Sequence, residues 1–155
     1  MKKVCTMGEL LVDFVPVDNL DNTYEMKFGG APGNVAATVS ILGGDATFYG
    51  QVGLDSFGDF LKSELKQMGV NTSYVLQTNQ AKTGITFVDI DKEGNRSFNF
   101  YRNPSADMLY SKEDYLEHSG LEDIFAFSSV SLIDYPIKDA HLAIIEKIKN
   151  HHGLV

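Results

Sequence analysis

The sequence is poor in several residue types, and each shortage argues against a class of protein. A single cysteine, Cys5, excludes an internal disulfide bond and is typical of a reducing compartment. No apolar run approaches the ~20 residues that a membrane-spanning helix requires. Thirteen basic residues against 21 acidic ones leave a net charge of −8, which argues against nucleic acid or anionic membranes as the main partner. We therefore expect a cytoplasmic protein with neither kind of partner.

Two common nucleotide-binding motifs are missing as well. No Gly-Lys-Ser/Thr follows the glycine-rich segment 28–44, so it is not a Walker A loop, and the Gly-x-Gly-x-x-Gly dinucleotide pattern is absent. Metal-ligand spacing is also absent: His118 and His141 have no partner, and the adjacent His151 and His152 would not face one ligand from a helix. A dinucleotide-dependent oxidoreductase and a metal centre are therefore poor interpretations.

Strand-like and helix-like segments alternate along the first 70 residues. Residues 4–15 are almost continuously apolar and predict a strand buried on both faces, with Asp13 as the exception near its end. A helix over 34–42, a strand over 46–52 and an amphipathic helix over 55–69 follow. This order predicts an α/β fold with a parallel sheet and right-handed crossovers.

Short strands replace this rhythm after residue 80. Segments 84–90 and 96–101 predict a hairpin, because the turn sequence DKEGN joins them. Along the second segment Phe98 and Phe100 share one face, whereas Tyr101 lies on the other. We expect a small β-element inserted into the α/β domain.

The last third predicts a strand over 124–130 and a helix that begins at Pro136. Leu154 and Val155 then begin another apolar segment. Because a domain rarely ends on the first residues of a core strand, we expect this chain to be the N-terminal part of a longer protein.

Polar groups stand at three points where an α/β sheet can hold a ligand. The segment FGGAPGNVAATVSILGG places glycines and Asn34 directly before a helix, where backbone and amide can approach a hydroxyl. Asp13 can accept hydrogen bonds from two neighbouring sugar hydroxyls, and GQVGLDSFG forms a strand-to-helix turn. Ordinary turn residues at the start of a helix, and a strand-end carboxylate facing water, would also explain these patterns.

Four segments together resemble the PfkB, or ribokinase-like, carbohydrate kinases, and specifically their fructokinase branch. These segments are GELLVDFVP, FGGAPGNVA, GQVGLDSFGDFL and FNFYRNPSADMLY, and the resemblance covers essentially the whole chain. It implies a Rossmann-like α/β domain with a small β-sheet lid, whose strands come from about 10–28 and 84–103. Such lids often pair in homodimers.

The resemblance also implies seven sugar-binding residues: Asp13, Gly29, Gly30, Asn34, Phe98, Tyr101 and Arg102. Asp13 would accept from sugar hydroxyls, the glycines would bring the backbone close, and Asn34 would supply an amide. Phe98 and Tyr101 would pack on the sugar, and Arg102 would meet a hydroxyl or a phosphate oxygen. A place in the lid core for Phe98, and a solvated strand end for Arg102, are the alternatives.

In this family the phosphoryl transfer depends on a later Gly-Ala-Gly-Asp segment, and the nucleotide site belongs to the C-terminal half. The resemblance therefore implies ATP and Mg²⁺ for the full-length enzyme, with a monovalent cation as a further candidate, but no catalytic residue and no metal ligand in this chain. The similar LGGD at 42–45 follows a helix instead of opening one. We expect the sugar-binding part of a fructokinase, inactive alone; the alternative is a truncated module that only binds sugar or dimerises.

Overall fold

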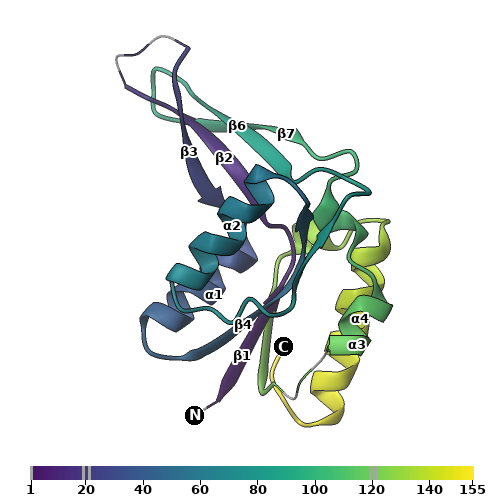
Figure 1. Cartoon of the computed structure of the whole chain (residues 1–155). Coiled ribbons are helices and arrows are strands. Elements are labelled where there is room, and N and C mark those ends of the chain that lie inside the picture. The colour runs from purple at the N-terminus through teal and green to yellow at the C-terminus, as the bar shows by residue number, and fades with distance from the viewer. Residues whose placement is uncertain (1, 19, 21, 119, 121) are drawn as a thin grey trace.

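The computed structural model describes residues 2–18, 20, 22–118, 120 and 122–155, which form two four-stranded sheets (Figure 1). The larger sheet has the order β5-β4-β1-β8, and all its neighbouring strands are parallel. Its strands are β1 (Lys3–Met7), β4 (Asp45–Gly53), β5 (Val75–Thr78) and β8 (Ile124–Phe127). The predicted parallel α/β fold is confirmed.

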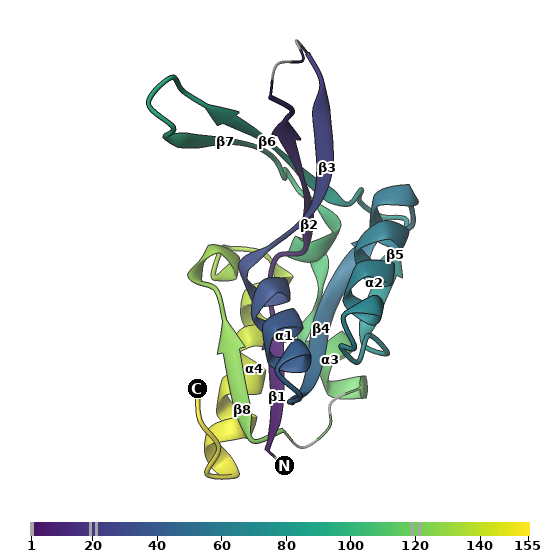
Figure 2. The ribbon, with the colours of Figure 1, turned by 90° about the vertical axis from the view of Figure 1, so that its left-hand side faces the viewer.

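The second sheet, which we call the lid sheet, has the order β3-β2-β6-β7. Its strands are β2 (Leu11–Pro16), β3 (Tyr24–Gly29), β6 (Gly84–Ile90) and β7 (Arg96–Tyr101). β2 and β6 are parallel, while the outer pairs β2–β3 and β6–β7 are antiparallel. Figure 2 shows these strands projecting beyond one end of the larger sheet. The predicted hairpin 84–101 is confirmed at the same boundaries.

Helices cover both faces of the larger sheet (Figure 1). α1 (Ala31–Ile41) and α2 (Ser56–Gln67) lie on one face, and α3 (Lys112–His118) and α4 (Pro136–Asn150) lie on the other. Two short 3-10 helices, η1 (Ala106–Leu109) and η2 (Ser129–Ser131), lie between them in the sequence. Within the described ranges, no helix is both long enough and apolar enough to cross a lipid bilayer.

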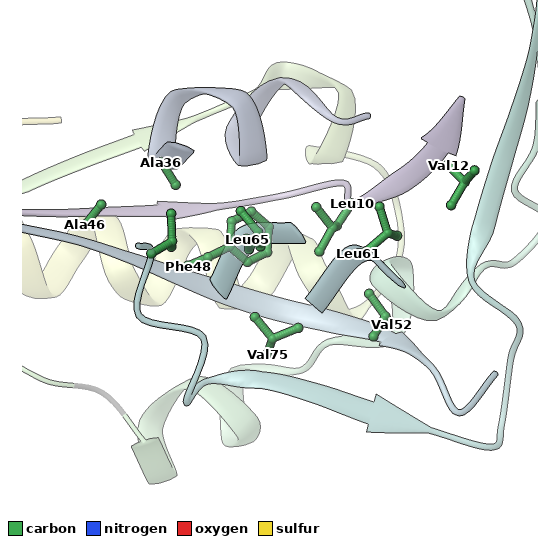
Figure 3. Packing of buried hydrophobic residues seen from close by; sticks show 10 residues of the cluster. Leu10, Val12, Ala36, Ala46, Phe48, Val52, Leu61, Leu65 and Val75 are labelled. Carbon is green, nitrogen blue, oxygen red and sulfur yellow. The ribbon is translucent and has the colours of Figure 1, made fainter. Parts of the chain in front are cut away.

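Each face of the larger sheet has its own apolar core. The core beneath α1 and α2 includes Leu10, Phe48 and Leu65, which point toward one another in Figure 3. The opposite core includes Tyr49 and Ile144. Because adjacent residues of β4 enter opposite cores, this strand is apolar along almost its whole length.

The single strand predicted over 4–15 is wrong. It consists of β1 and β2, which belong to different sheets and are separated at Gly8. Gly8 has φ +149°, and a Cβ atom there would lie 2.6 Å from Cγ of Pro32. A continuous apolar run does not reveal this break, because both strands are buried. Asp13 is consequently a lid-sheet residue and not the end of a strand in the larger sheet.

Other elements also differ from the prediction. α1 begins at Ala31, three residues earlier than expected, because Pro32 is compatible with the first helical turn. The predicted strand 124–130 ends at Phe127, and η2 follows it. The short strand β5 was not predicted.

Candidate functional site

A cavity of about 300 Å³ lies where the lid sheet meets the N-terminus of α1. Four parts of the chain line it: the loop between β1 and β2 together with β2 itself, the start of α1, β7 and η2. The lining residues are Glu9, Leu11, Asp13, Gly30, Ala31, Asn34, Phe98, Phe100 and Val130. The structure thus brings together Asp13, Gly30, Asn34 and Phe98, four of the seven residues that the resemblance implies.

Asp13 supplies a free acceptor in this cavity. Its side chain is half-buried, and no donor in the described part of the chain bonds to its carboxylate. Burial raises the pKa of Asp13 above its ordinary value of 3.8. A ligand hydroxyl would therefore find an acceptor whose hydrogen-bonding capacity is unused.

Gly29 and Gly30 shape the site by leaving room for other groups. A Cβ atom at Gly29 would lie 2.5 Å from Oδ2 of Asp13, so only glycine admits the carboxylate in its present position. Gly30 has φ +110°, and a Cβ atom there would lie 2.3 Å from the carbonyl oxygen of Glu9. Gly30 lines the cavity, whereas Gly29 acts through the placement of Asp13.

Asn34 lies in the first turn of α1 and is exposed toward the cavity. Its backbone N–H donates to the carbonyl of Gly30 at 3.1 Å, and its side-chain amide has no hydrogen-bond partner in the described part of the chain. The amide of Ala31, at the start of the same helix, donates to Oε1 of Glu9 at 3.3 Å. The polar side of the cavity therefore combines a carboxylate, an amide and a capped helix N-terminus.

Two aromatic rings from the lid sheet form the apolar side. Phe98 and Phe100 stack with ring centroids 6.0 Å apart, and they are 49% and 56% exposed. Phe98 is therefore not a residue of a closed lid core. Phe100 was not among the predicted site residues, although the period of two had already placed it on the face of Phe98.

Tyr101 does not line this cavity, so its contact with the sugar stays a prediction. Its ring meets Phe87 at 5.8 Å on the opposite face of the lid sheet, and it borders a separate cavity of about 380 Å³ near Phe57. Because alternate strand residues point to opposite faces, Tyr101 and Phe98 cannot reach the same side of β7.

Arg102 is also absent from the cavity lining. Its guanidinium forms an ion pair with Asp107, and only 9% and 0% of the two side chains are exposed. The Ser105 hydroxyl donates to the same carboxylate. Burial raises the pKa of Asp107 although Arg102 and Ser105 oppose this. The solvated strand end expected as the alternative is wrong, because the Arg102 side chain is buried in this ion pair, and contact of Arg102 with a sugar stays a prediction.

The GQVGLDSFG segment serves packing between elements. Asp55 caps α2 by accepting from the Gly58 amide at 2.9 Å, and it also accepts from the Thr83 hydroxyl at 2.7 Å and amide at 3.0 Å. Burial alone would raise the pKa of Asp55, but these backbone and hydroxyl donors lower it below its ordinary value. Asp55 thus joins α2 to the start of β6.

Comparison with known proteins assigns the chain to a family. The pfkB family carbohydrate kinase model matches residues 1–155. The chain belongs to this family. It is 42% identical over 154 residues to probable fructokinase-5 of Arabidopsis thaliana, and 41% identical over 153 residues to fructokinase-2 of Oryza sativa subsp. japonica. These matches cover 95% of this chain and 47% and 46% of the relatives.

Solved fructokinase structures of this family have the same fold. The Vibrio cholerae O395 fructokinase in its fructose, ADP and calcium ion bound form superposes with a TM-score of 0.88 and 31% identity, covering 99% of this chain and 49% of that one. The Xylella fastidiosa fructokinase with bound ATP gives 0.86 and 37%, covering 97% and 46%. The chain spans about half the length of the relatives it matches.

Two features bear on nucleotide and metal binding. The LGGD segment, residues 42–45, lies at the C-terminal end of α1, where Gly43 has φ +86°. As expected, it does not open a helix, so it offers no cluster of free N–H groups. Nowhere in the described ranges do three or more His, Cys, Asp or Glu side chains gather in a way that could hold a metal ion.

Proposed function

We propose that this chain is the sugar-binding part of an ATP-dependent fructokinase, which transfers the γ-phosphoryl group of ATP to a hydroxyl of fructose. The observation that carries the proposal is the Asp13 carboxylate, which lines one small cavity together with Asn34 and the start of α1 and has no hydrogen-bond donor among the described residues. The names of the relatives favour fructose over other sugars.

The cavity suits a sugar because its two sides differ in chemistry. A monosaccharide presents hydroxyls that donate to Asp13, and each such charge-assisted hydrogen bond contributes about 1.5–3 kcal/mol. Its C–H groups would pack on Phe98 and Phe100. An apolar ligand would leave the carboxylate buried without a donor, which is unfavourable.

ATP and Mg²⁺ belong to the proposed activity of the whole enzyme, and a monovalent cation is a further candidate. One Vibrio cholerae fructokinase structure contains ADP and a potassium ion, and the Xylella fastidiosa structure contains ATP. We assign no described residue of this chain to a metal or to the nucleotide. Phosphoryl transfer depends on groups that position the reactants and stabilise charge, and we assign none of these groups to this chain. We therefore expect no ATP-dependent fructose phosphorylation by these 155 residues alone.

Calorimetric titration with fructose tests the proposal. The 155-residue chain should bind fructose, and Asp13→Ala should abolish measurable heat, because the principal acceptor is lost. Asp139→Ala is the matched control: Asp139 is exposed on α4, which covers the opposite face of the larger sheet from α1. Equal heats from wild type and Asp13→Ala would remove Asp13 from the site and contradict the proposal.

A non-catalytic, dimerising role is the second candidate. The lid-sheet face opposite the cavity exposes Tyr24, Met26 and Tyr101, by 42%, 37% and 64% respectively. Apolar side chains gathered on one sheet face favour pairing with a second copy of this chain. This homodimer is compatible with the kinase proposal, since it uses the other side of the lid sheet.

A further inference from the structure

The carboxylate of Glu9 joins three segments that are distant in the sequence. Its side chain lies in the loop between β1 and β2, borders the cavity and is only 4% exposed. Oε1 accepts from the backbone amide of Ala31, at the start of α1, at 3.3 Å. Oε2 accepts from the hydroxyl of Ser131, in η2, at 2.8 Å, and Ser131 is fully buried. Both carboxylate oxygens are therefore engaged inside the protein.

Close packing holds these three segments at a fixed separation. A Cβ atom at Gly8 would lie 2.6 Å from Cγ of Pro32 and 3.2 Å from Oγ of Ser131. The carbonyl of Glu9 itself leaves no room for a side chain at Gly30. The loop, the helix and η2 therefore meet without space for one of them to shift inward.

Ser131 anchors a turn that contributes to the cavity. Val130, its neighbour in η2, is 47% exposed and lines the cavity together with Asn34 and Phe98. Among the described residues that line the cavity, Val130 is the only one from the last third of the chain. η2 is a single 3-10 turn with few hydrogen bonds of its own: 3.2 Å from Val130 N to Ser128 Oγ, 3.3 Å from Ser131 N to Ser128 O and 3.0 Å from Leu132 N to Ser129 O. Such a turn needs an external anchor to hold Val130 in place.

We propose that Glu9 is a positioning residue for sugar binding. Its carboxylate holds the first turn of α1 and the η2 turn together, and it thereby sets the width of the cavity between Asn34 and Val130. This inference rests on the proposed function, since it names a residue that determines the fit of the sugar. Glu9 acts through Ala31 and Ser131, since each of its two oxygens already accepts a hydrogen bond from one of them.

Three variants separate this role from general stability. Glu9→Ala removes both hydrogen bonds, and Ser131→Ala removes only the bond to η2. Glu9→Gln is the conservative rescue, because its amide oxygen can accept from Ala31 and its amide nitrogen can donate to the Ser131 hydroxyl. Glu117→Ala, at an exposed position of α3, and Ser129→Ala, at an exposed position of η2, are the matched controls.

The readouts are the fructose Kd by calorimetry and hydrogen exchange of the unliganded chain. We expect Glu9→Ala and Ser131→Ala each to weaken fructose binding about fivefold, because either change breaks the link between the first turn of α1 and η2. The double variant should be no weaker than Glu9→Ala, because both changes break the same link. Exchange should quicken at residues 128–132 in both single variants, while Glu9→Gln and both controls stay within about twofold of wild type.

Each negative outcome has a distinct meaning. If wild type binds fructose and Glu9→Ala and Ser131→Ala bind it within about twofold, the positioning role is wrong while the proposed function stands. If wild type does not bind fructose, the proposed function fails and the inference fails with it. If Glu9→Ala does not fold, Ser131→Ala decides: normal affinity in this variant overturns the inference, and weakened affinity with rapid exchange at 128–132 supports it.

Discussion

Asp13 is placed at a cost to stability that its proposed role in sugar binding would explain. Burial raises the pKa of its carboxyl above 3.8, so the folded chain binds this proton more tightly than the unfolded chain does. The folded state is therefore destabilised relative to the unfolded state as pH rises through the range above 3.8. A site that keeps a half-buried acceptor free for a ligand necessarily carries this penalty.

The raised pKa predicts opposite pH effects on binding and on stability. Fructose affinity should fall on acidification, with a midpoint above 3.8, because only the carboxylate accepts from two hydroxyls. Asp13→Asn should lose affinity at every pH yet have the higher melting temperature at neutral pH, since it removes the buried charge. Calorimetry and thermal denaturation from neutral pH down to 3.8 check both effects. An affinity that does not change over this range would exclude Asp13 as the acceptor.

At the scale of elements, the buried ion pair fastens the lid sheet to the body of the protein. Arg102 directly follows β7, and Asp107 lies in η1. η1 is fixed in turn, because the Gln51 side chain of β4 donates to the carbonyl of Ala106 at 3.1 Å. This chain of contacts sets where β7, and hence Phe98 and Phe100, lie relative to the larger sheet.

Removing one partner of this pair should therefore cost more than removing both. Arg102→Ala should lower the free energy of unfolding by about 3–5 kcal/mol, because the Asp107 carboxylate stays buried without its cation. Arg102→Ala combined with Asp107→Ala should lose less, and Arg96→Ala, at the exposed start of the same strand, should change stability by no more than about 0.5 kcal/mol. Urea unfolding measures all three. If Arg102→Ala lost fructose affinity while its free energy of unfolding stayed unchanged, Arg102 would be a sugar ligand and not a structural cation.

The whole molecule has a lid sheet with two unlike faces. One face carries Asp13 and Phe98 toward the cavity, and the other carries an aromatic group in which Phe14 stacks on Phe87 at 5.1 Å and meets Phe57 of α2 at 5.8 Å. Part of this second face packs on the protein's own α2. Tyr24 and Met26, on β3, remain exposed beside it.

This exposed face predicts a homodimer formed through the lid sheet. Combining Tyr24→Glu with Met26→Glu should convert the dimer to a monomer, because charges would replace apolar side chains at its centre. Leu42→Glu is the matched control, since Leu42 is 81% exposed at the end of α1, outside the lid sheet. Light scattering of the eluting protein measures the mass. A wild-type monomer at the concentrations used for calorimetry would contradict the prediction.

The sequence by itself determined the class of fold and the faces of the hairpin strands that it predicted. The alternation of SFNFYR already separated Tyr101 from Phe98, and the structure agrees with this pattern where the family resemblance had placed both on the sugar. The parallel sheet and the hairpin 84–101 were likewise predictable, since periodicity and turn residues are local features of the chain.

Only the tertiary structure decided which elements meet. It separated β1 from β2, seated the Asp13 carboxylate against Gly29, and brought Glu9 to Ser131, 122 residues away. It also buried Arg102, whose place at a strand end suggested solvent. The physical reason is that a local pattern records how exposed each face of an element is, whereas the partner of that face depends on how the whole chain packs.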